Sequence, residues 1–402
     1  MSTDTIQPDT ALRGLVDHLV GEGAIRTPAI EAAFRAVPRH RFLPGTPIAD
    51  VYADQIVVTK RGSDGAPLSS ASQPTIVARM LEQAQPQPGW RVLEIGAGTG
   101  YNAALLRELV GDAGQVTTID VYDDVVADAR RNLAGTGYDD VLVLTGDGAL
   151  GAPDHAPFDL IIVTAGAWDI PAAWWTQLAP TGRVVVPLRW RGLTRSLALD
   201  HQPAQPGRNA SLTSRSMHLC GFIAMTGSSD GGRIVALADD VTLFADQDQS
   251  IGEQLRGVLD APRAEAWSSV IIGGDQSMEG IWLRMSTAEA GTCRIKAAPS
   301  AVQSGRATPA TPVNPALAVD DSIAYLASRR VAAGVPRWEI GAIGHGPRGA
   351  ELAERITEQT RLWAEAPDAQ PTITLYPAGT PDEQMIDGLI IGKRDSRMVF
   401  TW

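Results

Sequence analysis

The sequence predicts an α/β protein in which a doubly wound, Rossmann-like sheet is followed by a second, smaller α+β domain. The chain has 402 residues, which suits two domains of ordinary size. From Arg91 onward, short continuous apolar runs alternate with amphipathic stretches, as in a parallel sheet whose strands are joined by helices. A glycine-rich turn also follows the first of these runs and precedes a helical pattern.

The first 90 residues are expected to contribute helices ahead of this sheet. Apolar residues recur at helical spacing from Leu12 to Val37, and Thr27-Pro28 has the form of an N-cap followed by proline at the first helical position. Two short helices are therefore expected there. A polar loop with glycines covers residues 60–67, and a further helix is expected over residues 75–83.

Residues 91–226 carry the alternating pattern. Strands are expected over residues 91–95, 115–120, 141–145, 158–164 and 183–187. Helices are expected over residues 102–110, 123–133 and 172–178. This order predicts a mostly parallel sheet that ends near Thr226.

Residues 231–402 are expected to form the α+β domain, after a glycine- and serine-rich break over residues 227–232. Strands are expected over residues 234–238, 241–244, 269–272, 281–285, 318–328, 338–344 and 372–376, and helices over residues 251–259 and 351–363. A second break, rich in Pro and Ala, covers residues 297–316.

Composition excludes several classes of function. The 34 Lys and Arg against 46 Asp and Glu give a net charge of -12, which repels nucleic acid. No run approaches the roughly 18 apolar residues of a membrane span, so no membrane partner is expected. Met1 to Thr10 lacks the pattern of a secretory signal, which indicates a cytoplasmic protein. Cys220, Cys293 and the scattered histidines suggest neither a disulfide framework nor a metal site.

The glycine-rich turn is the strongest local signal. Residues 92–101 read Val-Leu-Glu-Ile-Gly-Ala-Gly-Thr-Gly-Tyr, in which Gly96, Gly98 and Gly100 separate a strand from a helix. Glycines allow a sharp turn and a close approach to a ligand, and the helix N-terminus offers free N–H groups. A nucleotide-like ligand fits this turn, although its spacing differs from the G-x-G-x-x-G of dinucleotide sites.

Three acidic residues at successive strand ends favour S-adenosylmethionine as that ligand. Glu94 precedes the first glycine by two residues and could orient an ammonium and a sulfonium. Asp120 ends the next strand, where such folds bind ribose hydroxyls. Asp147 lies between two glycines after the third strand and could accept a hydrogen bond from an adenine amino group. Each acid alone could equally be a solvated loop residue.

Several segments together resemble the protein-L-isoaspartate O-methyltransferase family, in family order, over about residues 10–226. They are Val37-Pro-Arg-His-Arg-Phe-Leu-Pro44, Val51-Tyr-Ala-Asp54, Ser72-Gln-Pro-Thr-Ile-Val-Ala-Arg-Met80, residues 94–101, Gly146-Asp-Gly148 and Phe158-Asp-Leu-Ile-Ile-Val-Thr-Ala165. The Ser-Gln-Pro segment is the most discriminating of them. The resemblance implies a class I methyltransferase that transfers a methyl group from S-adenosylmethionine to a peptide carboxylate and releases S-adenosylhomocysteine.

The resemblance also implies roles for individual residues. Ser72 is expected to orient the substrate carboxylate by donating a hydrogen bond; the alternative is that it caps the helix that begins near Thr75. No general base is expected, because a carboxylate is already ionised at neutral pH. The expected cofactor-binding residues are Glu94, Gly96, Ala97, Gly98, Gly100, Asp120, Asp147, Gly148 and Thr164. The expected substrate-binding residues are Tyr52, Gln73, Pro187 and Arg189.

Two segments depart from the family pattern. Leu188-Arg-Trp-Arg-Gly192 and Cys220-Gly-Phe-Ile-Ala-Met225 replace residues with which family members shape the peptide cleft. Residues 231–402 resemble the C-terminal region of family homologues from actinobacterial ribosomal-peptide gene clusters, which accompany lanthipeptide or graspetide precursors. The resemblance therefore implies a modified precursor peptide as partner. One aspartate would be esterified, and the following amide would close an aspartimide that persists or hydrolyses to isoaspartate.

The sequence alone therefore leaves three functions open. They are esterification of a ribosomal peptide, broad repair of isoaspartate in proteins, and a non-catalytic scaffold that binds an adenosyl group. Residues 1–90 would supply the helices and the substrate side of the methyltransferase, residues 91–226 its cofactor core, and residues 231–402 peptide recognition. His345, between two glycines, could be a catalytic or a packing histidine.

Overall fold

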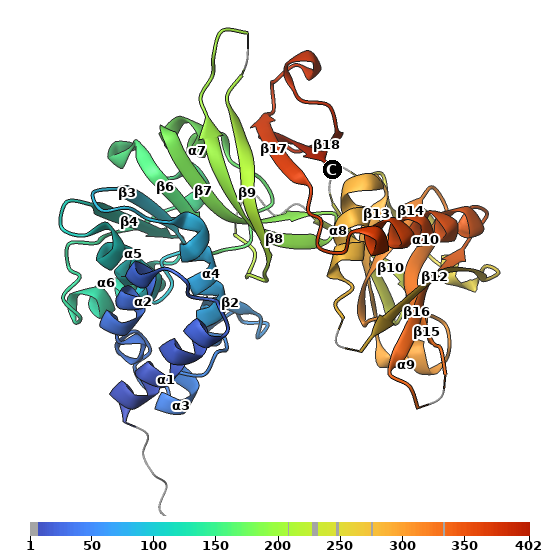
Figure 1. Cartoon of the computed structure of the whole chain (residues 1–402), viewed down its shortest axis with the longest axis horizontal. Helices are drawn as coiled ribbons and strands as arrows, with labels where there is room; N and C mark the ends of the chain where they lie inside the picture. Colours follow the sequence, from blue (N-terminus) through green and yellow to red (C-terminus); the bar gives the residue numbers. More distant parts are fainter. Residues whose placement is uncertain (1–6, 208, 227–231, 247–248, 275, 333) are drawn as a thin grey trace, which may run out of the picture.

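The structure, a computed structural model, describes residues 7–207, 209–226, 232–246, 249–274, 276–332 and 334–402. Within these residues there are a ten-stranded sheet, a seven-stranded sheet and a two-stranded hairpin. Figure 1 shows the two large sheets side by side, with the blue N-terminal helices at one end and the second sheet, in yellow and orange, at the other. The expected break over residues 227–232 lies almost wholly outside the described residues.

The ten-stranded sheet has a parallel half and an antiparallel half. The parallel half has the order β7-β6-β3-β4-β5, and the antiparallel half continues from β7 as β8-β9-β17-β19-β18. The strands of the first half are β3 (Arg91–Ile95), β4 (Gln115–Asp120), β5 (Leu142–Thr145), β6 (Phe158–Val163) and β7 (Leu178–Trp190). Those of the second half are β8 (Leu193–Gln202), β9 (Ser211–Leu219), β17 (Thr372–Pro377), β18 (Leu389–Gly392) and β19 (Ser396–Thr401).

The expectation of a mostly parallel sheet is therefore right for one half and wrong for the other. The strand expected over residues 183–187 lies within the 13-residue β7. Only Arg191 and Gly192 separate β7 from β8, and so short a connection allows antiparallel pairing alone.

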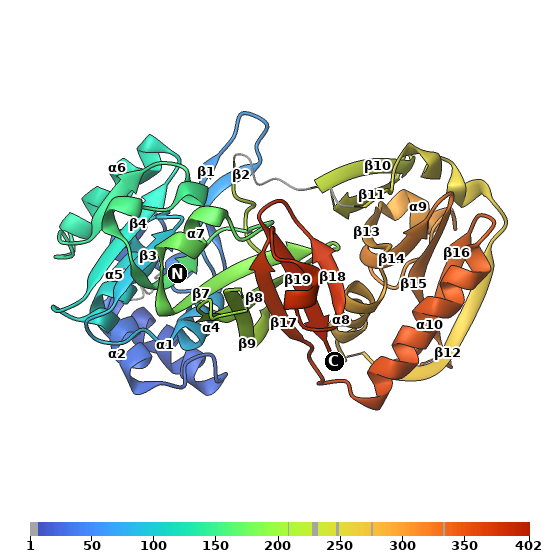
Figure 2. The same ribbon diagram turned by 90° about the horizontal axis from the view of Figure 1, so that it is seen from above.

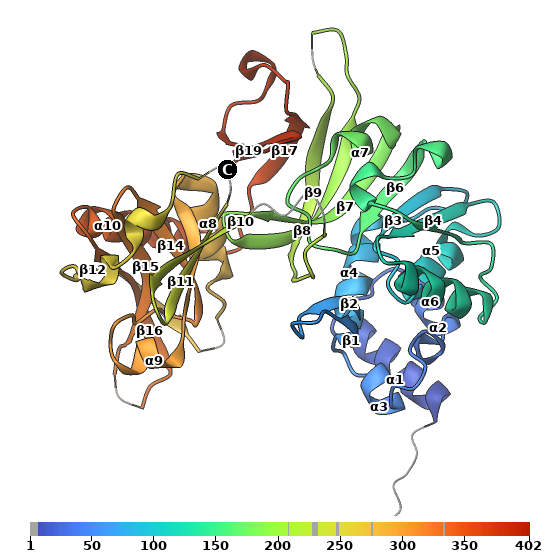
Figure 3. The same cartoon turned by 180° about the vertical axis from the view of Figure 1, so that it is seen from behind.

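Helices cover both faces of this sheet, and alternate residues of each strand enter two different cores. Val92 and Leu160 belong to the core under α1, α2, α4, α5 and α6, whereas Leu93 and Ile161 belong to the core under α7. The helices are α1 (Pro8–Gly21), α2 (Pro28–Ala36), α3 (Ile48–Val51), α4 (Pro74–Ala84), α5 (Tyr101–Val110), α6 (Asp123–Ala134) and α7 (Ala172–Gln177). Figure 3 shows α5 and α6 beside β3 and β4. The loop expected over residues 60–67 joins the hairpin strands β1 (Val57–Arg61) and β2 (Pro67–Ala71).

The second sheet is wholly antiparallel, in the order β10-β11-β13-β14-β15-β16-β12. Its strands are β10 (Gly232–Ala238), β11 (Val241–Asp246), β12 (Ala264–Gly273), β13 (Thr292–Ala297), β14 (Val313–Val319), β15 (Ser322–Arg330) and β16 (Arg337–His345). Its helices are α8 (Glu279–Ala288), α9 (Pro299–Gln303) and α10 (Gly349–Glu365). Among the described residues, no helix has the length and apolar content of a membrane span.

Three local expectations for this part are wrong. The strand expected over residues 281–285 is the helix α8, and the helix expected over residues 251–259 is two short 3-10 turns. The Pro- and Ala-rich break over residues 297–316 contains α9 and the start of β14, so it lies inside the second sheet.

The expected α+β domain, residues 231–402, also extends too far toward the C-terminus. Residues 372–401 leave the second sheet and return to the first, where β17 pairs with β9 and then carries β19 and β18. Ile373, Leu375 and Phe400 are buried in the same core as Leu93. Figure 2 shows these red strands between the two parts of the molecule. The second sheet is thus inserted between β9 and β17 of the first.

The two sheets meet through buried side chains. Trp282 and Leu283 of α8 join the core of the first sheet, while Ile281 and Met285 of the same helix join the core of the second. The β7–β8 turn reaches this junction at Gly192, which has φ +76° and a position where an added Cβ would lie 2.6 Å from the Arg294 Cβ. A side chain at residue 192 would therefore push the two parts apart.

Candidate active site

A cavity of about 1050 Å³ lies at the carboxyl ends of β3, β4 and β6. This is the edge at which open α/β sheets bind their ligands. Its size exceeds that of most pockets that hold one small molecule, so it has room for a cofactor and part of a substrate. Two other segments, residues 67–80 and 219–226, close it from the far side.

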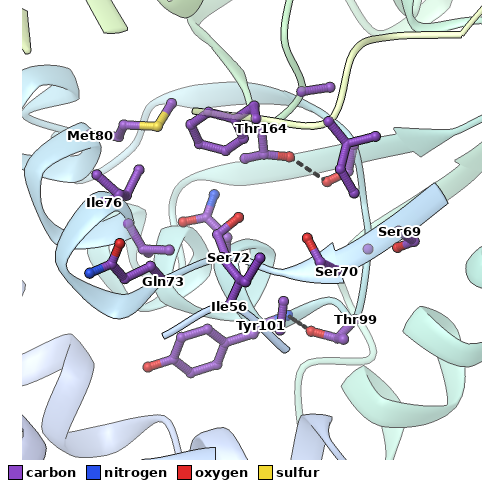
Figure 4. Close-up of a pocket in the computed structure, with 18 of the residues that line it drawn as sticks. Ile56, Ser69, Ser70, Ser72, Gln73, Ile76, Met80, Thr99, Tyr101 and Thr164 are labelled. Atoms are coloured by element: carbon purple, nitrogen blue, oxygen red, sulfur yellow. Dashed lines mark hydrogen bonds between the residues drawn. The ribbon is translucent and has the colours of Figure 1, made fainter. Parts of the chain in front are cut away.

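Most of the expected site residues line this cavity. They are Ser72, Gln73, Glu94, Gly96, Ala97, Gly98, Asp120, Asp147, Gly148 and Thr164. Figure 4 shows Ser72 with Ile76, Met80 and Thr164 around the same space. The structure therefore brings together residues from segments that are up to about ninety positions apart in sequence.

Two expected site residues, Tyr52 and Gly100, are absent from the described lining of the cavity. Tyr52 is buried in the core, and its hydroxyl is hydrogen-bonded to Nδ1 of His40 at 2.8 Å. Gly100 is the N-cap of α5 with φ +85°, and its N–H donates to the Ala97 carbonyl. Gly100 shapes the turn without facing the cavity.

Pro187 and Arg189 are likewise outside the described lining: the Pro187 carbonyl accepts from the Ala167 N–H, and the Arg189 side chain lies near Gly232 at the start of β10. The Arg189 guanidinium lies 5.6 Å from the centre of the Trp168 ring. Of the two segments that depart from the family pattern, only residues 220–225 line the cavity. Residues 188–192 form the junction with the second sheet instead.

The glycine-rich turn is built tightly against its neighbours. Gly96 has φ +102°, and a Cβ at this residue would lie 2.5 Å from the Thr164 hydroxyl oxygen. That hydroxyl donates to the Gly96 carbonyl at 2.7 Å. The N–H groups of Gly96 and Ala97 both donate to the Ile119 carbonyl. The turn is therefore fixed before any ligand binds.

Asp120 holds this turn as well as facing the cavity. Its Oδ2 accepts a hydrogen bond from the Gly98 N–H at 3.1 Å, and its Oδ1 accepts one from the Tyr122 N–H at 3.3 Å. Each carboxylate oxygen retains a second lone pair. Asp120 can therefore accept ribose hydroxyls without releasing the turn.

Glu94 is fully buried at the end of β3. Its Oε1 accepts from the Asn102 amide at 2.8 Å and its Oε2 from the Thr118 hydroxyl at 2.6 Å. Burial raises the pKa of Glu94 to about 7, although both hydrogen bonds act in the opposite direction. Near neutral pH this residue can change its charge when a cation arrives in the cavity.

Asp147 is the cap of a short 3-10 helix, Gly148–Leu150, and its Oδ1 accepts from the Ala149 N–H at 2.9 Å. The Gly148 carbonyl accepts from the Trp174 indole at 2.9 Å. These bonds fix the third strand end against α7. They leave Oδ2 of Asp147 for a ligand amino group.

Ser72 lies between β2 and α4, and the structure rejects the capping alternative for it. The N-cap of α4 is Gln73, and the Thr75 N–H donates to Oδ1 of Asp54 at 2.8 Å. Within the described residues, the Ser72 hydroxyl makes no hydrogen bond, whereas its carbonyl accepts from the Arg39 guanidinium at 3.0 Å. The hydroxyl is therefore available to a ligand in the cavity.

Arg39 and Asp54 are the residues whose part in the site the sequence did not reveal. Arg39 is fully buried, lies 5.2 Å from the centre of the Tyr101 ring and also donates to the Val51 carbonyl. Asp54 accepts from the Gln73 amide at 2.9 Å. Both residues lie in segments quoted above for the family resemblance, Val37–Pro44 and Val51–Asp54, and that resemblance was the available signal for them.

Two other groups that could carry chemistry are inert here. Burial raises the pKa of the Cys220 thiol to about 12, so this residue of the cavity wall is not a thiolate at neutral pH. His345 is buried in the second sheet, hydrogen-bonded through Nδ1 to the Ala261 carbonyl and stacked on Tyr325. Packing, the second of the alternatives given above for His345, matches this position.

The polar side chains that line the cavity fit S-adenosylmethionine. Acidic side chains at three successive strand ends suit an ammonium group, ribose hydroxyls and an adenine amino group, and the glycine turn leaves space beside them. When bound, this cofactor supplies an electrophilic methyl group. Within the described residues no three His, Cys, Asp or Glu side chains are grouped to hold a metal ion.

Comparison with known proteins gives a family match and close relatives. Residues 11–229 match the family model described as Protein-L-isoaspartate(D-aspartate) O-methyltransferase (PCMT). The chain is 43% identical over 175 residues to a protein-L-isoaspartate O-methyltransferase of Methanopyrus kandleri, which covers 43% of this chain and 75% of the relative. It is also 44% identical over 188 residues to a protein-L-isoaspartate O-methyltransferase of Methanoregula boonei. This alignment covers 47% of this chain and 82% of that relative.

One solved structure resembles more than the first part of the chain. A solved structure of a protein-L-isoaspartate O-methyltransferase aligns with this one with a TM-score of 0.50 and 22% sequence identity. The alignment covers 90% of this chain and 96% of the other chain. Residues 11–229 alone are too few for that coverage. The fold likeness therefore extends into the second sheet.

Proposed function

Because the chain belongs to the protein-L-isoaspartate(D-aspartate) O-methyltransferase family and is an S-adenosylmethionine-dependent carboxyl O-methyltransferase, we propose that it repairs proteins of broad range by methylating their isoaspartyl carboxylates. The observation that carries the proposal is the Ser72 hydroxyl. It faces the same cavity as the glycine turn and the three acids, while Arg39 holds the Ser72 carbonyl and Asp54 holds the side chain of the next residue, Gln73.

The residues of the chain have three tasks in this reaction. The substrate carboxylate is ionised at neutral pH and needs no base, so Ser72 only has to donate a hydrogen bond that fixes its direction. Asp120 and Asp147 would hold the ribose and adenine groups of the cofactor. The wall formed by residues 219–226 would exclude water from the reacting carboxylate.

A matched pair of peptides tests the substrate. The two peptides have one sequence, with an isoaspartyl linkage in one and an ordinary aspartyl linkage in the other. We expect the purified chain, given S-adenosylmethionine, to add one methyl group to the isoaspartyl peptide only. Mass spectrometry of both peptides measures this addition. Equal methylation of both peptides, or of neither, would contradict the proposal.

The ribosomal-peptide hypothesis gains no support from the comparisons, which favour the repair alternative. It rested on the departures at residues 188–192 and 220–225 and on the resemblance of residues 231–402, and the solved protein-L-isoaspartate O-methyltransferase structure shares a fold over 90% of the chain. A cyclised precursor peptide can be added to the assay as a third acceptor. Strong preference for that macrocycle over short isoaspartyl peptides would restore the hypothesis.

The scaffold alternative requires binding without turnover. Calorimetry with S-adenosylhomocysteine measures the cofactor site independently of any methyl acceptor. Binding of this product together with no methylation of any carboxylate would favour a scaffold. We expect both binding and turnover.

A further inference from the structure

The turn between β18 and β19 and the first residue of β19, together residues 393–396, dock on the loop that follows β6. We call these residues the C-terminal turn. The Lys393 ammonium donates to the carbonyls of Trp168 and Arg189, the latter at 2.6 Å, and lies 4.2 Å from the centre of the Trp168 ring. This single cation thus joins the loop after β6 and the end of β7 to a turn that is more than 200 positions away in sequence.

A buried carboxylate completes the contact. Asp169 is 3% exposed, and its two oxygens accept from the Asp395 N–H at 2.7 Å, the Ser396 hydroxyl at 2.5 Å and the Ile170 N–H at 2.7 Å. A buried carboxylate costs free energy unless it is hydrogen-bonded. Two of its three donors come from the C-terminal turn, so the loop is held in place by residues near the end of the chain.

The same loop carries one wall of the active-site cavity. The Gly166 N–H donates to the Ile223 carbonyl at 2.7 Å, and the Met225 N–H donates to the Gly166 carbonyl at 2.9 Å. Residues 220–226, which we call the wall segment, line the cavity but lie outside the named strands. Their position therefore depends on Gly166, three residues before Asp169.

We propose that the C-terminal turn is a positioning element of the methyltransferase site, which keeps the wall segment in place for the peptide through Asp169 and Gly166. The part of this that concerns the peptide rests on the proposed function. The glycine turn and Asp120 are held by the Ile119 carbonyl, the Gly98 N–H and Thr164, none of which contacts Lys393 or Ser396, so we expect cofactor binding to change little when these two side chains are replaced.

Variants of the turn test this with a matched control on the same hairpin. Lys393→Met and Ser396→Ala, singly and combined, remove contacts to the loop, and Lys393→Arg restores the charge. Arg397→Met is the control, because Arg397 donates instead to the Thr380 carbonyl at 2.9 Å and to Asp382 at 2.6 Å. Each protein is tested as the full chain.

Two measurements are made on each variant. Hydrogen exchange, followed by mass spectrometry, reports the amides of the wall segment without any methyl acceptor. We expect exchange there to be about tenfold faster in the combined variant, because it loses the hydrogen bonds of Lys393 to two carbonyls and that of Ser396 to Asp169. We expect KM for an isoaspartyl peptide to rise about tenfold while kcat and the dissociation constant of S-adenosylhomocysteine stay within about twofold.

The outcomes separate this inference from the proposed function. Unchanged exchange of the wall segment in the combined variant, or an equal effect of Arg397→Met, overturns the role of the turn. Recovery of both readouts in Lys393→Arg supports it. A wild-type chain that methylates no isoaspartyl peptide overturns the proposed function, and the exchange comparison then decides the role of the turn by itself.

Discussion

Ser72 combines a fixed backbone with an uncommitted hydroxyl. The Arg39 guanidinium binds its carbonyl, and Asp54 binds the side chain of the following residue. A hydroxyl that is already positioned loses little freedom when a carboxylate arrives. Charge-assisted hydrogen bonds of this kind contribute about 1.5–3 kcal/mol. The residue can therefore orient a substrate without being a nucleophile.

Removal of that hydroxyl should slow the reaction and leave the cofactor in place. We expect Ser72→Ala to lower kcat/KM for an isoaspartyl peptide by about tenfold to a hundredfold, from the loss of one charge-assisted hydrogen bond. The dissociation constant of S-adenosylhomocysteine, measured by calorimetry, should change less than about twofold. Ser70→Ala, on the same side of the cavity, is the control. Normal turnover of Ser72→Ala would show that the hydroxyl has no part in the reaction.

Glu94 should make the stability of the apo protein depend on pH. Its pKa is raised from an ordinary 4.5 to about 7 by burial, so the folded state prefers the protonated form. The stabilisation by this residue is then complete below pH 4.5 and is lost as the pH rises through about 7. At about 1.4 kcal/mol per pH unit, the loss is on the order of 3 kcal/mol.

Chemical denaturation of the wild type and of Glu94→Gln at pH 5 and at pH 8 measures this effect. Glutamine is neutral at both values and can still accept from Thr118 or Asn102. We expect the denaturation midpoint of the wild type to fall relative to that of Glu94→Gln between the two values. A constant difference between the two proteins would mean that Glu94 ionises normally.

At the scale of elements, the start of α4 depends on a residue twenty-one positions away. Asp54 accepts from the Thr75 N–H and the Thr75 hydroxyl, both at 2.8 Å, and takes the place of an N-cap side chain. Burial raises the pKa of Asp54, but the hydrogen bonds from Thr75 and Gln73 outweigh it and leave the pKa below its ordinary value. Its stabilisation is therefore present at neutral pH and is lost as the pH falls through the folded pKa.

Asp54→Ala should destabilise α4 and disturb Ser72 at its start. We expect a loss of about 1–2 kcal/mol in the free energy of unfolding, the usual cost of a lost helix cap. Thermal unfolding at pH 7 measures it, with the exposed Asp50→Ala of α3 as the control. The difference between wild type and Asp54→Ala should shrink in acid. Equal effects of the two substitutions would contradict the capping role.

The parallel half of the first sheet was predictable because its signals are local. Each buried strand is a continuous apolar run, and each crossover helix has an amphipathic period. The same rule failed for α8, which was predicted as a strand. Ile281 and Met285 face one core while Trp282 and Leu283 face another, so this helix buries apolar residues on two sides and has no single apolar face.

The candidate site was predictable where a motif carried it, and less so where distant segments meet. Ser72, Glu94, Asp120 and Asp147 line one cavity as expected. Arg189 does not, because β7 is longer than its apolar run indicated and carries this residue to the other sheet. Pairing between β9 and β17 joins residues more than 150 positions apart, and a strand pattern contains no information about its partner.

At the scale of the molecule, the inserted second sheet is coupled to the first through α8 and the β7–β8 turn. The Trp190 indole donates to the Ser286 hydroxyl at 3.1 Å, and the Trp282 indole donates to the Arg191 carbonyl at 3.4 Å. Trp282 is 8% exposed and packs in the core of the first sheet. Because the chain crosses to the second sheet and returns, unfolding of one part should disturb the other.

This coupling predicts that a ligand of the first sheet protects the second. S-adenosylhomocysteine at a hundredfold excess over its dissociation constant should stabilise the fold by about 2.7 kcal/mol. If both sheets unfold together, hydrogen exchange of β14 and β15 should slow by up to about a hundredfold. We expect this protection to be lost in Trp282→Ala and kept in Trp267→Ala, which changes a tryptophan of the second sheet outside the junction. Equal exchange with and without the ligand in the wild type would mean that the two sheets unfold independently, and that the insertion has left the methyltransferase part energetically separate.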